Sequence, residues 1–105
     1  MKEITVQELQ AKLNNKENFQ LIDVREIYEH EAASIGGELI PLATVLDNVN
    51  KISKDKQVVI YCRSGNRSGV AIRQLEQQFG FTNLYNLKGG ILAYARDIDP
   101  SLSVS

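Results

Sequence analysis

The segment QVVIY, at positions 57–61, constrains the fold more than any other, because it is the most β-branched run in the chain. Such residues favour strands, and this run is the best candidate for a central strand. Strand-like and helix-like segments alternate on both sides of it, with short links between them. This alternation predicts an α/β fold in which a mostly parallel central sheet carries helices on both faces.

The other expected elements follow from local signals in the sequence. A capping box at Thr5 and Glu8 opens a first helix, whose apolar residues Val6, Leu9 and Leu13 keep a helical spacing. Ser68 can cap the helix after the central strand, and Gly80 lies at the C-terminal end of that helix. We expect strands at 19–24, 38–41, 57–61 and 83–87, and helices from Thr5 to about 14, and at 26–33, 43–49, 68–79 and 91–97.

Length and charge limit the classes of function. A chain of 105 residues is long enough for one hydrophobic core, and we expect one domain over 1–105. Its 12 basic and 13 acidic residues are interspersed, which leaves no basic face for nucleic acid and no cationic helix for a membrane. The N-terminal residues lack an apolar signal core, and no run of 18 apolar residues occurs. We therefore expect a cytoplasmic protein.

Cys62 is the only cysteine in the chain, so it forms no internal disulfide and is either an inert core thiol or a reactive one. It directly follows the expected central strand, and α/β sheets bind their ligands at the carboxyl ends of the strands. The loop after it contains Gly65 and Asn66, which tolerate positive φ, so its N–H groups can turn inward around the sulfur. With Arg63 and Arg67 nearby, these groups favour a thiolate and lower the pKa of the thiol. This pattern favours a reactive thiol.

Four segments together resemble the rhodanese-like sulfurtransferases. They are LIDVRE at 21–26, IGGELIPL at 35–42, CRSGNRS at 62–68 and NLKGGILAY at 86–94. Along the chain they follow the same order as in the family. The resemblance implies a rhodanese-like fold and a cysteine that takes a sulfane sulfur from a small anionic donor such as thiosulfate, holds it as a persulfide and passes it to a nucleophile. Cyanide, a thiol or a sulfur-carrier protein could be that acceptor.

The site residues follow from the resemblance, residue by residue. Cys62 corresponds to the nucleophile and persulfide carrier, and no metal or organic cofactor is implied. The residues that correspond to the substrate-binding loop are Arg63, Ser64, Gly65, Asn66, Arg67 and Ser68. Because a second cysteine is lacking, no internal thiol can resolve the persulfide, and the sulfur has to leave to another molecule.

Residues outside the loop are expected to have structural roles. Asp23 and Arg25 follow the first strand of the expected core and can form an ion pair that supports the loop. His30, the only histidine, lies between glutamates on a short helix, so we interpret it as solvated rather than as a catalytic base. Gly89 and Gly90 allow a tight turn into the last helix.

Two other classes of function stay open at this point. A cysteine phosphatase or arsenate reductase also has a thiolate in an anion-binding loop, but its arginine follows after five intervening residues, where this chain has Ser68. Arg67 comes one position early, and Tyr61 rather than histidine precedes the cysteine. A non-catalytic rhodanese-like binding module is the other alternative, although such modules tend to lose the cysteine.

The C-terminal segment GGILAYARDIDPSLSVS has a resemblance of its own. It is similar to the end of the rhodanese domain that follows the E1-like adenylyltransferases of molybdopterin and thiamine biosynthesis. That similarity implies a ubiquitin-like sulfur-carrier protein and its adenylyltransferase as partners. Whether these residues are a whole protein or one domain of a longer chain stays open.

Overall fold

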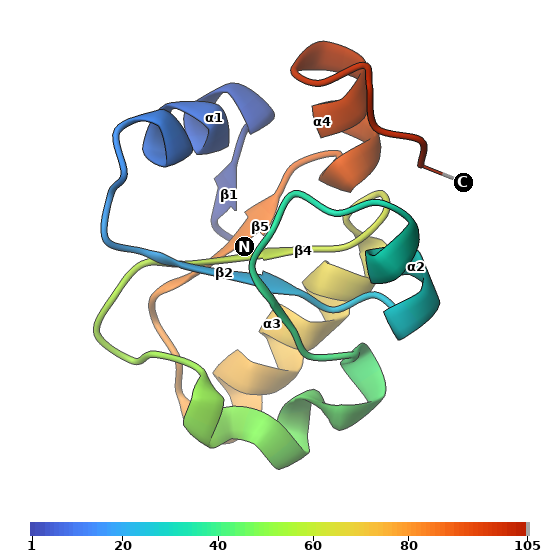
Figure 1. Cartoon of the computed structure of the whole chain (residues 1–105). Helices are drawn as coiled ribbons and strands as arrows, with labels where there is room; N and C mark the ends of the chain where they lie inside the picture. Colours follow the sequence, from blue (N-terminus) through green and yellow to red (C-terminus); the bar gives the residue numbers. More distant parts are fainter. Residues whose placement is uncertain (105) are drawn as a thin grey trace.

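A five-stranded, all-parallel sheet organises the computed structural model, which describes residues 1–104 (Figure 1). Ser105, the last residue of the expected domain, lies outside the described residues. In chain order the elements are β1 (Glu3–Ile4), α1 (Val6–Asn14), β2 (Gln20–Asp23), α2 (Ile27–Ala32), β3 (Glu38–Leu39), the 3₁₀ segment η1 (Leu42–Lys51), β4 (Val58–Tyr61), α3 (Asn66–Phe79), β5 (Leu84–Leu87) and α4 (Gly90–Asp97).

The strand order is β1-β5-β4-β2-β3, with β4 in the centre as the sequence predicts. All four residues of β4 are buried. The edge strand β1 was not predicted, because its two residues are too short a run to show an alternating pattern. It pairs with β5, so that Glu3 lies opposite Asn86.

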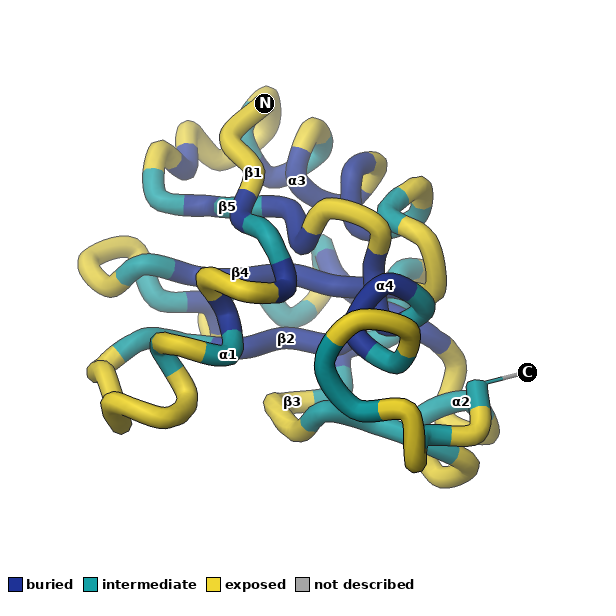
Figure 2. The backbone as a smooth tube through the Cα atoms, turned by 90° about the horizontal axis from the view of Figure 1, so that it is seen from above, coloured by how far each residue is buried: buried dark blue, intermediate teal, exposed yellow. Residues whose placement is uncertain are grey.

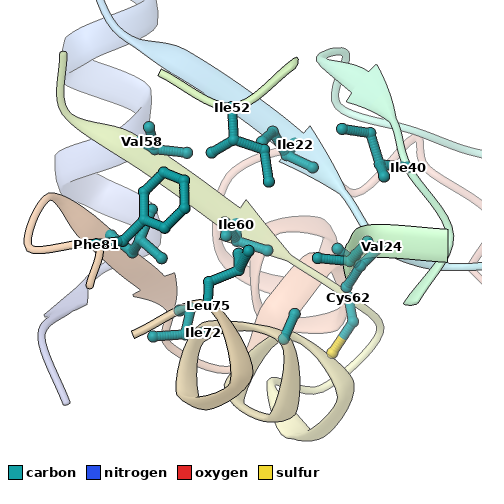
Figure 3. Packing of buried hydrophobic residues seen from close by; sticks show 13 residues of the cluster. Ile22, Val24, Ile40, Ile52, Val58, Ile60, Cys62, Ile72, Leu75 and Phe81 are labelled. Carbon is teal, nitrogen blue, oxygen red and sulfur yellow. The ribbon is translucent and has the colours of Figure 1, made fainter. Parts of the chain in front are cut away.

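Helices cover both faces of the sheet, as expected for this α/β fold (Figure 2). Side chains alternate along β4, so Val58 and Ile60 belong to one core cluster and Val59 and Tyr61 to the other. The first cluster packs under α3 and η1, and Cys62 lies at its margin (Figure 3). The second cluster packs under α1 and α4. The central strand is thereby shielded from water on both sides.

The capping box at Thr5 is confirmed: the Thr5 hydroxyl accepts from the Glu8 N–H, and the Glu8 carboxylate accepts from the Thr5 N–H. Gly80 ends α3 with a φ of 68°, also as predicted. The expected helix at 43–49 is instead a longer 3₁₀ segment, interrupted at Asn48, whose backbone is not helical.

The prediction that Ser68 caps α3 is wrong. The helix begins two residues earlier, at Asn66, and its N-cap is Gly65 with a φ of 109°. A glycine reaches this left-handed conformation without strain, so the chain turns directly into the helix. Ser68 then lies in the first turn, fully buried, and its hydroxyl is available for other partners.

Candidate active site

Cys62 is the first residue after β4, at the edge of the sheet where the parallel strands end. Its side chain is buried, with a relative exposure of 1%. Residues 63–65 form a short turn between the strand and α3, so the thiol lies beside the first turn of that helix (Figure 3). The predicted junction of thiol, glycine-containing loop and helix N-terminus is therefore present.

Hydrogen-bond donors surround the sulfur in place of water. The Gly65 N–H donates to Sγ over 3.1 Å, and the Ser68 hydroxyl lies 3.3 Å from it. Burial raises the pKa of Cys62, whereas hydrogen bonds from the Ser68 side chain and from the backbone of Ser68, Gly65 and Ser64 lower it. The donors outweigh burial, so the pKa of the thiol lies below its ordinary value. Loop and helix N-terminus together favour the thiolate.

Asn86 on β5 joins this arrangement, although the sequence analysis did not single it out. Its Oδ1 accepts from the Ser68 hydroxyl over 2.6 Å, and its Nδ2 donates to the Gly65 carbonyl over 3.0 Å. Asn86 is buried, with a relative exposure of 6%. The available signal was a polar residue inside the otherwise apolar strand that precedes the Gly-Gly turn.

The Gly89–Gly90 turn lies directly against the loop, in addition to starting α4 as predicted. The Ile91 N–H donates to the Cys62 carbonyl over 3.0 Å, and the Leu92 N–H donates to the Arg63 carbonyl over 3.1 Å. Gly90 has a φ of 62°, and a Cβ atom there would lie 2.6 Å from the Cys62 carbonyl oxygen. The close approach therefore requires glycine at this position.

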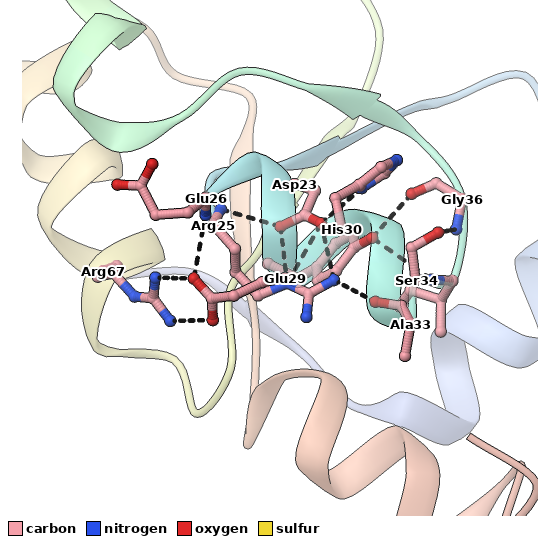
Figure 4. A network of polar contacts seen from close by, with 11 residues as sticks. Asp23, Arg25, Glu26, Glu29, His30, Ala33, Ser34, Gly36 and Arg67 are labelled. Atoms are coloured by element: carbon pink, nitrogen blue, oxygen red, sulfur yellow. Dashed lines mark hydrogen bonds and ion pairs between the residues drawn. The ribbon is translucent and has the colours of Figure 1, made fainter. Parts of the chain in front are cut away.

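Arg67 forms a two-pronged ion pair with Glu29 on α2 (Figure 4). Its guanidinium nitrogens lie 2.7 and 2.9 Å from the two carboxylate oxygens. This pairing lowers the pKa of Glu29 to about 2. Arg67 ties the loop to α2, while Arg63, beside the thiol, is exposed. The predicted donor-binding roles of both arginines stay predictions.

Asp23 and Arg25 form a buried ion pair at the end of β2, with 2.9 Å between Oδ2 and Nη2. Arg25 also donates to the Ala33 carbonyl over 2.7 Å, and His30 Nδ1 lies 2.8 Å from Asp23 Oδ2. His30 is thus attached to this ion pair, rather than solvated as we interpreted it. The pair holds the C-terminal end of α2, and α2 in turn holds Arg67 through Glu29 (Figure 4).

An open hollow of about 660 Å³ lies behind the loop, lined by Gly65, Asn66 and Asn86 together with Met1, Glu3 and Arg73. Cys62 is not among the residues that line it. Because the thiol does not line this space, we do not assign the sulfur donor to it. Among residues 1–104, no group of three or more His, Cys, Asp and Glu side chains is placed to hold a metal ion. Within the same residues, no helix has the length and apolar character needed to cross a membrane.

Fold and site together define a parallel α/β domain with a cysteine held in a cradle of backbone donors at a strand–helix junction. Residues 5–97 match the family model described as "Rhodanese-like domain". The chain therefore belongs to the rhodanese-like family.

Individual relatives agree with this assignment. A protein named "Sulfurtransferase" from Allochromatium vinosum is 40% identical over 95 residues, which cover 90% of this chain and 88% of that protein. "Probable adenylyltransferase/sulfurtransferase MoeZ" from Mycobacterium tuberculosis is 33% identical over 94% of this chain, which spans only 26% of MoeZ. A rhodanese-like domain protein from Staphylococcus aureus has a crystal structure that matches with a TM-score of 0.83 and 33% identity, covering 100% of this chain and 99% of that one. Homologues with these names support a role in sulfur transfer.

Proposed function

We propose that this chain is a sulfurtransferase that carries sulfur as a persulfide on Cys62. The Cys62 thiolate attacks the outer sulfur of a donor such as thiosulfate, and the S–S bond of the donor breaks. Sulfite leaves with the electron pair of that bond, while the outer sulfur stays on Sγ as a persulfide anion. A nucleophilic acceptor then attacks the outer sulfur and regenerates the thiolate.

The observation that carries this proposal is the cradle of donors around Cys62. A buried anion on sulfur is costly unless hydrogen-bond donors replace water, and the Gly65 N–H and the Ser68 hydroxyl lie within reach of Sγ. In the proposed roles, Ser64, Gly65, Asn66 and Ser68 form the cradle, and Arg63 and Arg67 attract the anionic donor. Asp23 and Arg25 support the loop through α2. The chemistry uses only these groups and requires no cofactor.

The direct test is an intact-mass measurement after incubation with thiosulfate. We expect the protein to gain the mass of one sulfur atom, to lose it when cyanide is added, and to release thiocyanate. Cys62→Ser serves as the matched control and should gain nothing. A protein that stays unmodified while its thiol reacts normally with iodoacetamide would favour a binding module instead. Turnover of an aryl phosphate or of arsenate would favour the phosphatase or arsenate reductase alternative.

For the acceptor, we propose a ubiquitin-like sulfur-carrier protein activated by an adenylyltransferase. The support is the similarity to MoeZ and the C-terminal segment of 89–105, and a protein acceptor also fits a chain with one cysteine. With this role we also propose a cytoplasmic location. The test mixes persulfidated protein with an adenylated carrier and looks for a carrier thiocarboxylate by mass. Transfer only to cyanide or small thiols would contradict this acceptor and leave a general thiosulfate sulfurtransferase.

A further inference from the structure

The orientation of the Asn86 amide is fixed by its neighbours. The Gly65 carbonyl can only accept a hydrogen bond, so the Asn86 group that faces it over 3.0 Å has to be the NH₂ group. The amide oxygen must then face Ser68, whose hydroxyl lies 2.6 Å away. A flipped amide would bring two oxygens together at Gly65.

Ser68 has a single hydroxyl proton and two neighbours that can take it. One is Asn86 Oδ1 at 2.6 Å, and the other is Cys62 Sγ at 3.3 Å. The Asn86 oxygen has no proton of its own in this contact, so the short bond forms only if Ser68 donates. While Ser68 donates to Asn86, its oxygen can only accept a hydrogen bond from the sulfur. Cys62 can donate that bond only as a protonated thiol.

We propose that Asn86 is a positioning residue that draws the Ser68 hydroxyl proton away from Cys62 and so competes with the thiolate for it. In the thiol form, hydrogen bonds run in one direction, from Cys62 to Ser68 and from Ser68 to Asn86. When the thiol loses its proton, the hydroxyl must turn toward Sγ and give up Asn86. When Sγ carries the outer sulfur, it is no longer the anionic atom, and the hydroxyl can return to Asn86.

Only the thiolate form requires the Ser68 hydroxyl to rotate away from Asn86, so only this form loses the hydrogen bond to Asn86. A hydrogen bond to a charged group is stronger than one to a neutral amide, so the Ser68 hydroxyl still stabilises the thiolate. The net stabilisation is only the difference in free energy between the bond to the thiolate and the bond to Asn86. The Gly65 N–H, by contrast, already donates to Sγ. Asn86 therefore restrains the reactivity of the free thiol while leaving the persulfide form undisturbed.

The other charged groups around Cys62 are the same whatever stands at position 86. Arg63 and Arg67 come from the loop and the start of α3, and Arg67 is paired with Glu29 from α2. On the side of β1 and α3, Glu3 and Arg73 line the hollow behind Asn86. Differences between variants at position 86 thus report on Ser68 and on any charge introduced there.

Two variants with the same number of side-chain heavy atoms separate this proposal from a purely structural role. Asn86→Leu and Asn86→Asp both remove the donor to the Gly65 carbonyl, so loss of loop support would move both in the same direction. They differ in what they offer to Ser68, because leucine releases the hydroxyl and a carboxylate holds it more tightly. The readout is the rate of alkylation by iodoacetamide as a function of pH, which gives the pKa of Cys62.

We expect the midpoint to fall by about half a unit to one unit in Asn86→Leu and to rise in Asn86→Asp, since one hydrogen bond changes the balance by roughly 1 kcal/mol. In a Ser68→Ala background, Asn86→Leu should cause no shift, because the hydroxyl through which it acts is gone. Shifts in the same direction, an unchanged Asn86→Leu midpoint, or a full shift without the hydroxyl would each overturn the proposal.

Ser68→Ala alone keeps the test available if the variants at Asn86 do not fold, as judged by circular dichroism. A hydroxyl that must give up its hydrogen bond to Asn86 stabilises the thiolate only by the difference between the two hydrogen bonds. Ser68→Ala should therefore raise the midpoint of the alkylation rate against pH by less than about one unit. A larger rise would show that the hydroxyl donates to sulfur without competition and would overturn the proposal. The purpose assigned to Asn86 rests on the proposed function, but alkylation needs no sulfur donor. A failure of sulfur transfer is therefore distinguishable from a failure of this inference.

Discussion

At the scale of single residues, the central fact is that a buried sulfur can be charged only where donors replace its water. Cys62 is as inaccessible as the core residues beside it, yet the Gly65 N–H and the Ser68 hydroxyl face its sulfur. Burial and hydrogen bonding therefore act in opposite directions on the same atom, and the hydrogen bonds prevail.

A first prediction concerns the acidity of this thiol. The pKa of Cys62 is lowered, so the thiolate is present at a lower pH than in a free cysteine, whose pKa is about 8.5. We expect the midpoint of the iodoacetamide rate against pH to lie below that value in the native protein and to return to it in urea. A native midpoint at or above that of the unfolded chain would contradict the role assigned to the cradle.

Replacing the nucleophile should separate chemistry from folding. Cys62→Ser puts a hydroxyl of similar size at the position, and this hydroxyl cannot form a persulfide. We expect release of thiocyanate from thiosulfate and cyanide to fall to the rate without protein, while the urea midpoint changes little. Residual turnover in this variant would exclude Cys62 as the sulfur carrier.

At the scale of elements, the loop depends on two neighbours that approach it from different directions. Helix α2 holds Arg67 through Glu29, and the start of α4 holds the backbone of Cys62 and Arg63. Both contacts link segments that are far apart in the sequence, so the shape of the loop is a property of the packed elements.

The ion pair of Glu29 on α2 with Arg67 on α3 should make the free energy of unfolding depend on pH. The pKa of Glu29 is lowered to about 2 in the folded protein from an ordinary 4.5, so its contribution is complete above pH 5 and is lost as the pH falls toward 2. Because Arg67 is 35% exposed, we expect a contribution of about 1 kcal/mol rather than the full linkage value.

The measurement is urea unfolding of Glu29→Gln and of native protein at pH 7 and pH 3. The difference between the two proteins should be present at pH 7 and smaller at pH 3. Glu31→Gln, an exposed position on the same helix, is the matched control and should differ from native protein at neither pH. An equal loss at both pH values would show that the charge of Glu29 is not the cause.

The turn before α4 gives a prediction about steric fit. Gly90→Ala introduces a Cβ against the backbone of Cys62 and Arg63, so we expect a loss of about 2–4 kcal/mol and slower alkylation of the thiol. Gly80→Ala is the control, since Gly80 has a similar φ of 68° with no atom within 4 Å of the added Cβ. It should lose only about 1 kcal/mol, the cost of the left-handed backbone. Equal losses would mean that the close approach is unimportant.

Elements with a strong local signal were predictable from sequence, and those defined by packing were not. The β-branched run gave β4, and the capping box gave α1, because both patterns act within a few residues. The Cys62 loop was recognisable for the same reason. By contrast, β1 is a strand only because β5 lies beside it, and the partners Asn86 and Glu29 come from segments that no short-range pattern connects to the loop.

At the scale of the whole molecule, the ion pair of Asp23 and Arg25 is a buried polar feature of the core. Both side chains are almost completely buried, and Arg25 reaches from the end of β2 to the Ala33 carbonyl. Asp23→Asn would leave the guanidinium charge buried without a counter-ion. We expect a loss of about 3–5 kcal/mol in the free energy of unfolding, a large part of the stability of a small domain.

Urea unfolding measures this loss, and Asp97→Asn serves as the control. Asp97 pairs with Arg96, which is 71% exposed, so breaking that pair should leave the unfolding midpoint nearly unchanged. If Asp23→Asn were equally mild, the buried pair would not be a major support of α2 and of the loop that α2 holds.

The parallel sheet also determines when during folding the thiol becomes reactive. Glu3 pairs opposite Asn86, and the carbonyls of Cys62 and Arg63 are held by residues 91 and 92. Contacts between such distant positions form slowly, because long loops must close first. A nascent chain that has emerged from the ribosome only as far as α3 thus carries an ordinary cysteine, and the anion-stabilising cradle is completed only after residues 86–92 have been synthesised as well.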